Sequence, residues 1–394
     1  MRKTGHIRER SPGSFELRYE LGVNPATGER RTATLTVRGS RKDAERELRR
    51  LLRALDTGEH VDPHRITVRE WLRTWLDAVR PEVAPRTAER YAEIVSNYLA
   101  PALGNLSLTK LAPLHIQEAY NGWATGGRRD GKPGSLSPRT RRHIHRILGA
   151  ALDRALEQQL LARNPCDAFR KRLPKVERRE MATLTTEQSM RLLDAVRHSH
   201  VYWPVLLALA TGARRGETLA LRWRNVDLDR GMVRIVESLE QTRAGLRFKA
   251  PKTERGRAVT LPSFAIEELR RRKREQAEDL LKLGVRQTEA TLVCARRDGE
   301  PLQPQSLTHE FPRFLARLGR EFPGVRFHDL RHSHATQLLL AGVHPKVAQE
   351  RLGHSTISTT LDLYSHVSAT MQEDAAARID AAFRHAKIAP EGAR

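Results

Sequence analysis

Apolar residues recur every three or four positions in residues 66–169, and this spacing restricts that part of the chain to helices. Thr67 and Glu70 form the capping-box pattern that begins a helix. The residues after Thr67 place one continuous apolar stripe along a helix: Val68, Trp71, Leu72, Trp75, Leu76 and Val79. Because strands require an apolar residue at every second position, the segment is predicted to be a helical bundle.

Three further helices are expected before residue 170. The spacing is repeated by a second apolar set: Tyr91, Ile94, Val95, Tyr98 and Leu99. A third helix is predicted near residues 113–123. Ser137 followed by Pro138 supplies the N-cap and first helical residue of a fourth helix. That helix has its own core-facing set: Ile144, Ile147, Leu148, Leu152 and Ala155. Asn164 and Pro165 are predicted to end this unit.

Residues 1–39 show the two-residue period of strands instead. Phe15, Leu17, Tyr19 and Leu21 alternate with charged residues, and Ala33, Leu35 and Val37 form a return strand after the turn-forming sequence GVNPATGE. Ser40 with Asp43 indicates the N-cap of a following helix. We therefore expect a sheet of two or three strands plus one helix over residues 1–60. Residues 56–65 are expected to be a linker. A dimerisation or packing appendage remains the alternative.

The charge of the chain indicates a polyanionic partner. Seventy Lys and Arg residues against 47 Asp and Glu give a net charge of +23, spread over all segments. Such a balance is typical of proteins that wrap nucleic acid, although membrane surfaces also attract it. The fourth helix carries candidate DNA-binding residues on the face opposite its core: Arg139, Arg141, Arg142 and Arg146. A merely solvated charged face is the alternative.

Cysteine content and hydropathy exclude several classes. The two cysteines, Cys166 and Cys294, allow neither a disulfide framework nor a zinc site. No Cys/His or carboxylate cluster has the spacing of metal ligands, so no metal or cofactor is expected. The N-terminus has no apolar leader, and no 18-residue apolar stretch occurs. The chain is therefore expected to be cytoplasmic, with no membrane partner.

Two segments carry chemically informative residues. The first, ATGARRGETLALRW, begins where the apolar run 201–210 ends, and it contains Arg214 and Glu217. The second is HDLRHSHATQLLLAGVHPKVAQERLGHSTISTTLDLY. Its His328 and Arg331 lie three residues apart, on one face of a helix, and Gly353 is predicted to stop a short helix before His354. The H-x-x-R pattern is weak alone, since it also occurs at His143.

The order of these motifs carries the assignment. T-G-x-R-x-G-E, a lysine in PKTERGRAVTLP, H-x-x-R, L-G-H and a tyrosine resemble the tyrosine recombinases, including phage integrases. The resemblance assigns the catalytic roles to six residues: Arg214, Lys252, His328, Arg331, His354 and Tyr364. It implies an α+β protein, mainly α with small antiparallel sheets. It also implies cleavage without metal or ATP, double-stranded DNA as partner, a tetramer on DNA, a free monomer or dimer, and a directionality factor.

The resemblance also divides the chain. It implies an arm-type DNA-binding domain over 1–60, a helical core-binding domain over 65–169, a basic linker over 170–181, a catalytic domain over 182–385 and a tail over 386–394. Strands at 233–236, near Phe248 and at 259–261 are expected to form one small catalytic-domain sheet. Glu217 is expected to orient arginines. The alternatives are a type IB topoisomerase and a non-catalytic DNA-binding protein of the same fold.

Overall fold

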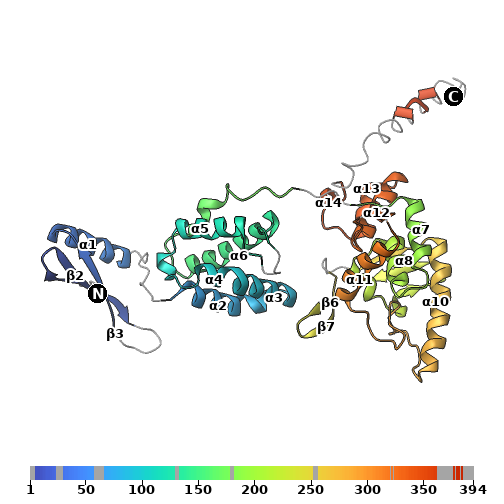
Figure 1. The fold of residues 1–394 in the computed structure, drawn as a ribbon, viewed down its shortest axis with the longest axis horizontal. Coiled ribbons are helices and arrows are strands. Elements are labelled where there is room, and N and C mark those ends of the chain that lie inside the picture. Colours follow the sequence, from blue (N-terminus) through green and yellow to red (C-terminus); the bar gives the residue numbers. More distant parts are fainter. Residues whose placement is uncertain are drawn as a thin grey trace, which may run out of the picture. The chain divides into compact units, whose positions relative to one another are not determined.

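The computed structural model describes residues 5–23, 30–56, 66–128, 133–177, 182–251, 256–319, 321–322, 324–361, 376–377, 379–381 and 383–384. The chain divides into two compact units, residues 1–178 and 179–394. Both are built from helices and small antiparallel sheets (Figure 1), which confirms the expected α+β class. Among the described residues, none of the helices is long and apolar enough to cross a bilayer.

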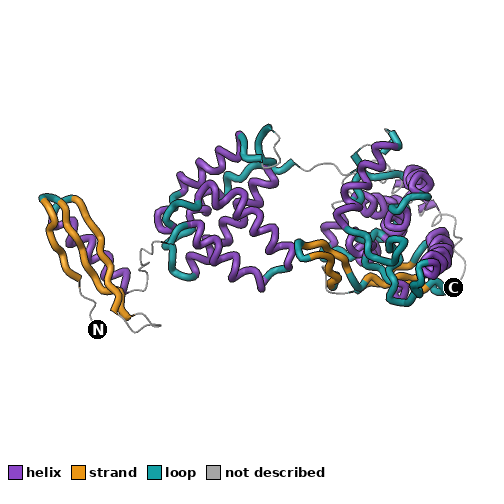
Figure 2. Tube along the Cα trace, turned by 60° about the horizontal axis from the view of Figure 1, so that its bottom comes forward, coloured by secondary structure: helices purple, strands orange, loops and turns teal. Residues whose placement is uncertain are grey.

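The N-terminal segment is a three-stranded antiparallel sheet with one helix. Strands β1 (Gly5–Ser11), β2 (Ser14–Val23) and β3 (Arg30–Arg38) lie in that order, and α1 (Arg41–Asp56) covers one face (Figure 2). The predicted alternation is confirmed, because Phe15, Leu17 and Tyr19 are buried. Ser40 and Asp43 cap α1 reciprocally. The predicted return strand is confirmed as β3, on which Leu35 is 37% exposed.

The helical segment contains the predicted helices in somewhat different form. Its elements are α2 (Val68–Val79), η1 (Arg80–Glu82), α3 (Pro85–Ile94), η2 (Val95–Leu99), α4 (Ala100–Leu103), η3 (Leu108–Lys110), α5 (Pro113–Thr125), α6 (Pro138–Glu157) and η4 (Pro165–Phe169). Thr67 and Ser137 cap α2 and α6 as predicted. Trp71 in α2 donates its indole N–H to the Ala151 carbonyl at 2.8 Å, which ties α2 to α6.

Two prolines change this segment. The second predicted helix is interrupted by the π-helical turn η2, because Pro101 has no N–H to continue the regular ladder. The prediction that Asn164 and Pro165 end the unit is wrong. Asn164 instead caps η4 by accepting from the Cys166 N–H at 2.9 Å, and Cys166 and Phe169 pack into the same core.

The second unit has a mainly helical core flanked by small sheets. Its elements are α7 (Thr186–Val196), α8 (Tyr202–Thr211), α9 (Arg215–Leu219), η5 (Trp223–Asn225), β4 (Val226–Asp227), β5 (Met232–Ile235), β6 (Ser238–Thr242), β7 (Gly245–Lys249), β8 (Arg257–Thr260), α10 (Ser263–Lys282), α11 (Pro304–Arg317), α12 (Asp329–Leu340), α13 (Pro345–Leu352) and α14 (Ile357–Leu361). The one predicted sheet is two, β4-β5-β8 and the hairpin β6-β7. Helix α8 is buried on all sides, as its apolar sequence requires, and α10 lies along one side of the unit (Figure 1).

Candidate active site

Two helix ends meet at the centre of the site. Helix α8 ends at Gly212 and α13 at Gly353, both in the left-handed conformation with φ of +66°. A Cβ at Gly212 would lie 2.6 Å from the ring of His334 and 2.7 Å from Leu352, so only glycine fits between them. The last turn of a helix leaves carbonyl groups without helical partners and carries partial negative charge. The two ends therefore offer acceptors to cations.

Arg331, on α12, uses those acceptors. It is 4% exposed, and its two terminal nitrogens donate to the carbonyl oxygens of Gly212 and Leu352, each at 2.6 Å. Within the described part of the chain it has no carboxylate partner. Burial, and next the charge of Arg214, lower the pKa of Arg331 to about 9, so it remains a cation at neutral pH. Its charge is thus held by helix ends and is not neutralised.

Arg214 precedes α9 and belongs to the same cluster. Its Nη1 donates to Glu217 Oε1 at 2.8 Å, and its Nη2 to the Gly353 carbonyl at 3.0 Å. Glu217 is only 3% exposed and also accepts from Arg257 Nη2 at 2.6 Å. Burial by itself would raise the pKa of this carboxyl, but the hydrogen bonds and charges of Arg257 and Arg214 hold it at about 2. Glu217 is thus a fixed anion between two arginines, a geometry that fits an orienting role.

The two predicted histidines border this cluster. His354 follows Gly353, and its Nδ1 lies 2.9 Å from the hydroxyl of the buried Thr360. Burial first, and then the charges of Arg331 and Arg214, lower the pKa of His354 to about 4, so the ring is neutral at pH 7. His328 occupies the exposed N-cap position of α12. Desolvation of the ring by the surrounding protein, and next the charge of Arg331, lower the pKa of His328 as well.

The structure brings together four of the six predicted catalytic residues: Arg214, His328, Arg331 and His354. Lys252 and Tyr364 lie outside the described residues. The predicted DNA-binding arginines lie on α6, in the first unit. Of these, Arg139, Arg142 and Arg146 are exposed and Arg141 is half-buried. Arg146 contacts His143 Nδ1 at 2.7 Å, so the second H-x-x-R pair belongs to that helix and not to this site.

Three residues of the cluster were missed in the sequence: Arg257, His334 and Arg351. Arg351 Nε donates to His334 Nε2 at 3.0 Å, and His334 Nδ1 donates to the Leu209 carbonyl at 2.7 Å. Arg257 lies two residues before the buried Val259 in β8, and therefore on the same face of the strand. An arginine at a core-facing strand position was a signal in the sequence that could have identified it.

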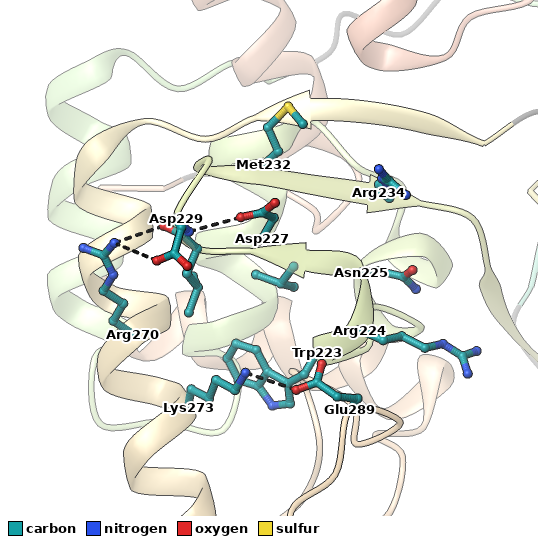
Figure 3. A pocket seen from close by; sticks show the side chains of 12 residues that line it. Trp223, Arg224, Asn225, Asp227, Asp229, Met232, Arg234, Arg270, Lys273 and Glu289 are labelled. Carbon is teal, nitrogen blue, oxygen red and sulfur yellow. Dashed lines mark hydrogen bonds and ion pairs between the residues drawn. The ribbon is translucent and has the colours of Figure 1, made fainter.

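A pocket of about 600 Å³ lies apart from these arginines, between β4, β5 and α10 (Figure 3). Four of its charged side chains pair with one another: Arg270 with Asp229 at 3.9 Å, and Lys273 with Glu289 at 3.3 Å. None of the four predicted catalytic residues that the structure describes lines it. In the part of the chain that is described, no three His, Cys, Asp or Glu side chains gather as metal ligands would.

Comparison with known proteins identifies the class. Residues 182–371 match the phage integrase family, and residues 67–124 match its N-terminal SAM-like domain. A XerC-like tyrosine recombinase of Caldanaerobacter subterraneus is 28% identical over 290 residues, covering 69% of this chain and 71% of its own. The integrase of Mycobacterium phage L5 is 30% identical over 260 residues, covering 65% of this chain and 64% of its own.

Solved structures share the fold. The Tn1549 transposon integrase, in complex with a circular intermediate DNA, has a TM-score of 0.65 at 21% identity, covering 80% of this chain and 99% of its own. A lambda integrase dimer bound to a COC' core site has a TM-score of 0.56 at 19% identity, covering 91% and 93%. The chain belongs to the phage integrase family of tyrosine recombinases. It is a site-specific DNA recombinase.

Proposed function

We propose that this recombinase cuts and rejoins DNA through a covalent bond between Tyr364 and a 3′-phosphate. The observation that carries the proposal is the charge of the buried cluster. Arg214 and Arg257 share the carboxylate of Glu217, and the third guanidinium, that of Arg331, has no carboxylate partner among the described residues. An uncompensated positive charge at a buried site fits an anionic ligand, and arginine forks match the oxygens of a phosphodiester.

In this mechanism Tyr364 Oη attacks the scissile phosphorus while the bond to the 5′ oxygen breaks. The pentavalent transition state carries added charge on its non-bridging oxygens, which Arg214 and Arg331 offset. The phenol proton passes to His328, whose lowered pKa leaves a neutral ring to accept it. His354 donates a hydrogen bond to the phosphate, and Lys252 protonates the leaving oxygen. Rejoining reverses these steps, so neither metal nor ATP takes part.

The remaining parts have binding roles in this proposal. Residues 65–169 and 182–385 close around duplex DNA through the linker 170–181, with the α6 arginines on phosphates. Residues 1–60 bind distal arm sites. The face of their sheet opposite α1 supports this role, because it carries exposed basic and hydroxyl side chains, although Glu16 and Glu20 lie on it too: Arg8, Arg18, Thr34, Thr36 and Arg38. A lambda integrase tetramer has been solved on a Holliday junction. We propose a similar tetramer here, in the bacterial cytoplasm, with a directionality factor.

The decisive experiment traps the covalent intermediate. A nicked suicide duplex, built from the sequences flanking the element that carries the gene, is incubated with the enzyme in excess EDTA. We expect adduct on Tyr364 by peptide mass, and no adduct with Tyr364→Phe. Adduct on another residue, or cleavage that needs magnesium, contradicts the mechanism. Relaxation of a supercoiled plasmid that lacks the site would favour the topoisomerase alternative.

A further inference from the structure

We propose that Arg257 is a positioning residue for the phosphate-binding arginines, an inference that rests on the proposed function. Arg257 reaches from the first residue of β8 to both sides of the site. Its Nη2 donates to Glu217 Oε2 at 2.6 Å, and its Nε donates to the Arg351 carbonyl at 2.8 Å. One planar group therefore fixes the anion that holds Arg214 and the last turn of the helix that precedes His354.

Burial makes this link rigid. The Arg257 side chain is 9% exposed, so water does not compete for most of its donors. A Cβ added to Gly353 would lie 3.0 Å from Arg257 Nη1 and 3.2 Å from its Cδ, so the guanidinium packs directly under the turn. Strand β8 is anchored in turn, because Arg257 pairs with the buried Ile235 of β5. The sheet thus sets where Glu217 and Gly353 lie.

The third guanidinium nitrogen, Nη1, indicates a role for Arg257 beyond its ion pair with Glu217. Arg257 Nη1 is buried and has no hydrogen-bond partner among the residues that the structure describes, and an unpaired buried donor costs free energy. Its charge adds to those of Arg331 and Arg214 at the site, and it helps to lower the pKa of Arg331. The geometry therefore gives Arg257 two effects. It places Arg214 through Glu217, and it raises the positive potential at the bound phosphate without touching it.

Loss of Arg257 should therefore impair charge stabilisation and leave binding intact. In Arg257→Gln we expect single-turnover cleavage of the suicide duplex to fall about 100-fold, the size of effect typical for one lost electrostatic contributor. DNA affinity should stay within about threefold of wild type, because the contact is not to DNA. Arg257→Lys keeps the charge but loses the fork, so its rate should lie between the two.

A charge-neutral substrate tests the role directly. A methylphosphonate at the scissile position replaces one non-bridging oxygen by methyl and removes the charge that the arginines offset. Arg257→Gln should cleave this substrate within about fivefold of the wild-type rate. Arg272→Gln is the matched control: Arg272 also donates to two carbonyls, those of Val293 and Ala295, but lies on α10. The Arg272→Gln enzyme should cleave the natural and the methylphosphonate substrate at the wild-type rate.

The outcomes separate the two proposals. If the wild-type enzyme forms no Tyr364 adduct, the proposed function fails. If the wild type forms it and Arg257→Gln cleaves both substrates at normal rates, Arg257 has no positioning role. Equal slowing on both substrates, with Arg257→Lys no better than Arg257→Gln, would mean that the residue only supports the fold, and the inference is then wrong.

Discussion

The guanidinium of Arg331 donates to the carbonyl oxygen of Gly212 at 2.6 Å, across 119 residues of sequence. This bond joins the start of α12 to the end of α8, and a second bond, to Leu352, joins it to the end of α13. The carbonyl groups at two helix ends therefore orient Arg331, as the carboxylate of Glu217 orients Arg214. Because carbonyl groups orient a guanidinium without neutralising it, the site keeps positive charge for its substrate.

Glu217 should be a major contributor to stability. Replacing it with Gln leaves Arg257 and Arg214 without their buried anion, and breaking a buried pair costs about 3–5 kcal/mol. Chemical denaturation at pH 7 should show that loss in Glu217→Gln. The folded pKa of about 2 lies below the ordinary 4.5, so this stabilisation is complete above pH 4.5 and is lost as pH falls toward 2. A variant as stable as wild type would show that the anion is dispensable.

Gly353 should matter for both stability and cleavage. Alanine there must adopt φ of +66° and place its Cβ 3.0 Å from Arg257 Nη1. Gly284 is the control, because it has φ of +73° with open space around it. Both alanine variants should lose about 1–2 kcal/mol from the left-handed backbone. Only Gly353→Ala should also slow cleavage of the suicide duplex. Slowing by Gly284→Ala to the same extent would refute the contact argument.

His334 should stay neutral far below its ordinary range. Burial first, and then the charge of Arg351, lower its pKa from 6.5 to about 4, while its bond to Leu209 opposes the shift. The unfolded chain takes up the proton first, so stability falls as pH drops from 6.5 to 4, by about 3 kcal/mol for this ring. NMR of the imidazole should show no protonation above pH 5, and His334→Gln should flatten the stability curve in that window. A ring that titrates near pH 6.5 contradicts the prediction.

The α6 arginines should act on all DNA sequences alike. Arg139, Arg142 and Arg146 are exposed and have no acidic partner among the described residues. Replacing all three with Ser should reduce the slope of log K against log salt by about three, one unit per phosphate contact. Arg154, also on α6 but paired with Glu157 at 3.4 Å, is the control. Binding titrations over a salt series measure both. An unchanged slope in the triple variant would assign these residues to a solvated face.

The sheet face of residues 1–60 should affect assembly and not chemistry. Replacing Arg8, Arg18 and Arg38 with Ser should weaken recombination of a long attachment site, because arm contacts act by tethering. Cleavage of a short core site should stay unchanged. The control removes Arg49, Arg50 and Arg53 from α1, on the other face of the sheet. Equal recombination by the two triple variants would make this segment a packing appendage.

Local patterns in the sequence were sufficient for most elements. The capping pair at Thr67, the Ser137-Pro138 start and the stop at Gly353 all appear in the structure, because each depends on contacts within four residues. Failures came where distant packing intervenes. Pro165 does not end the unit, because Phe169 packs into the core of the helical bundle.

The same division holds for the site. Motif order alone singled out Arg214, His328, Arg331 and His354, since their chemical types and sequence of appearance are linear information. That Arg331 is held by two helix ends, and that Glu217 is shared with Arg257, depends on contacts between residues 21 to 119 positions apart. Hydrogen bonds and burial, which fix charge and pKa, act through space. Only the tertiary structure could therefore place Arg257 beneath Gly353 and leave the cluster with an excess of positive charge.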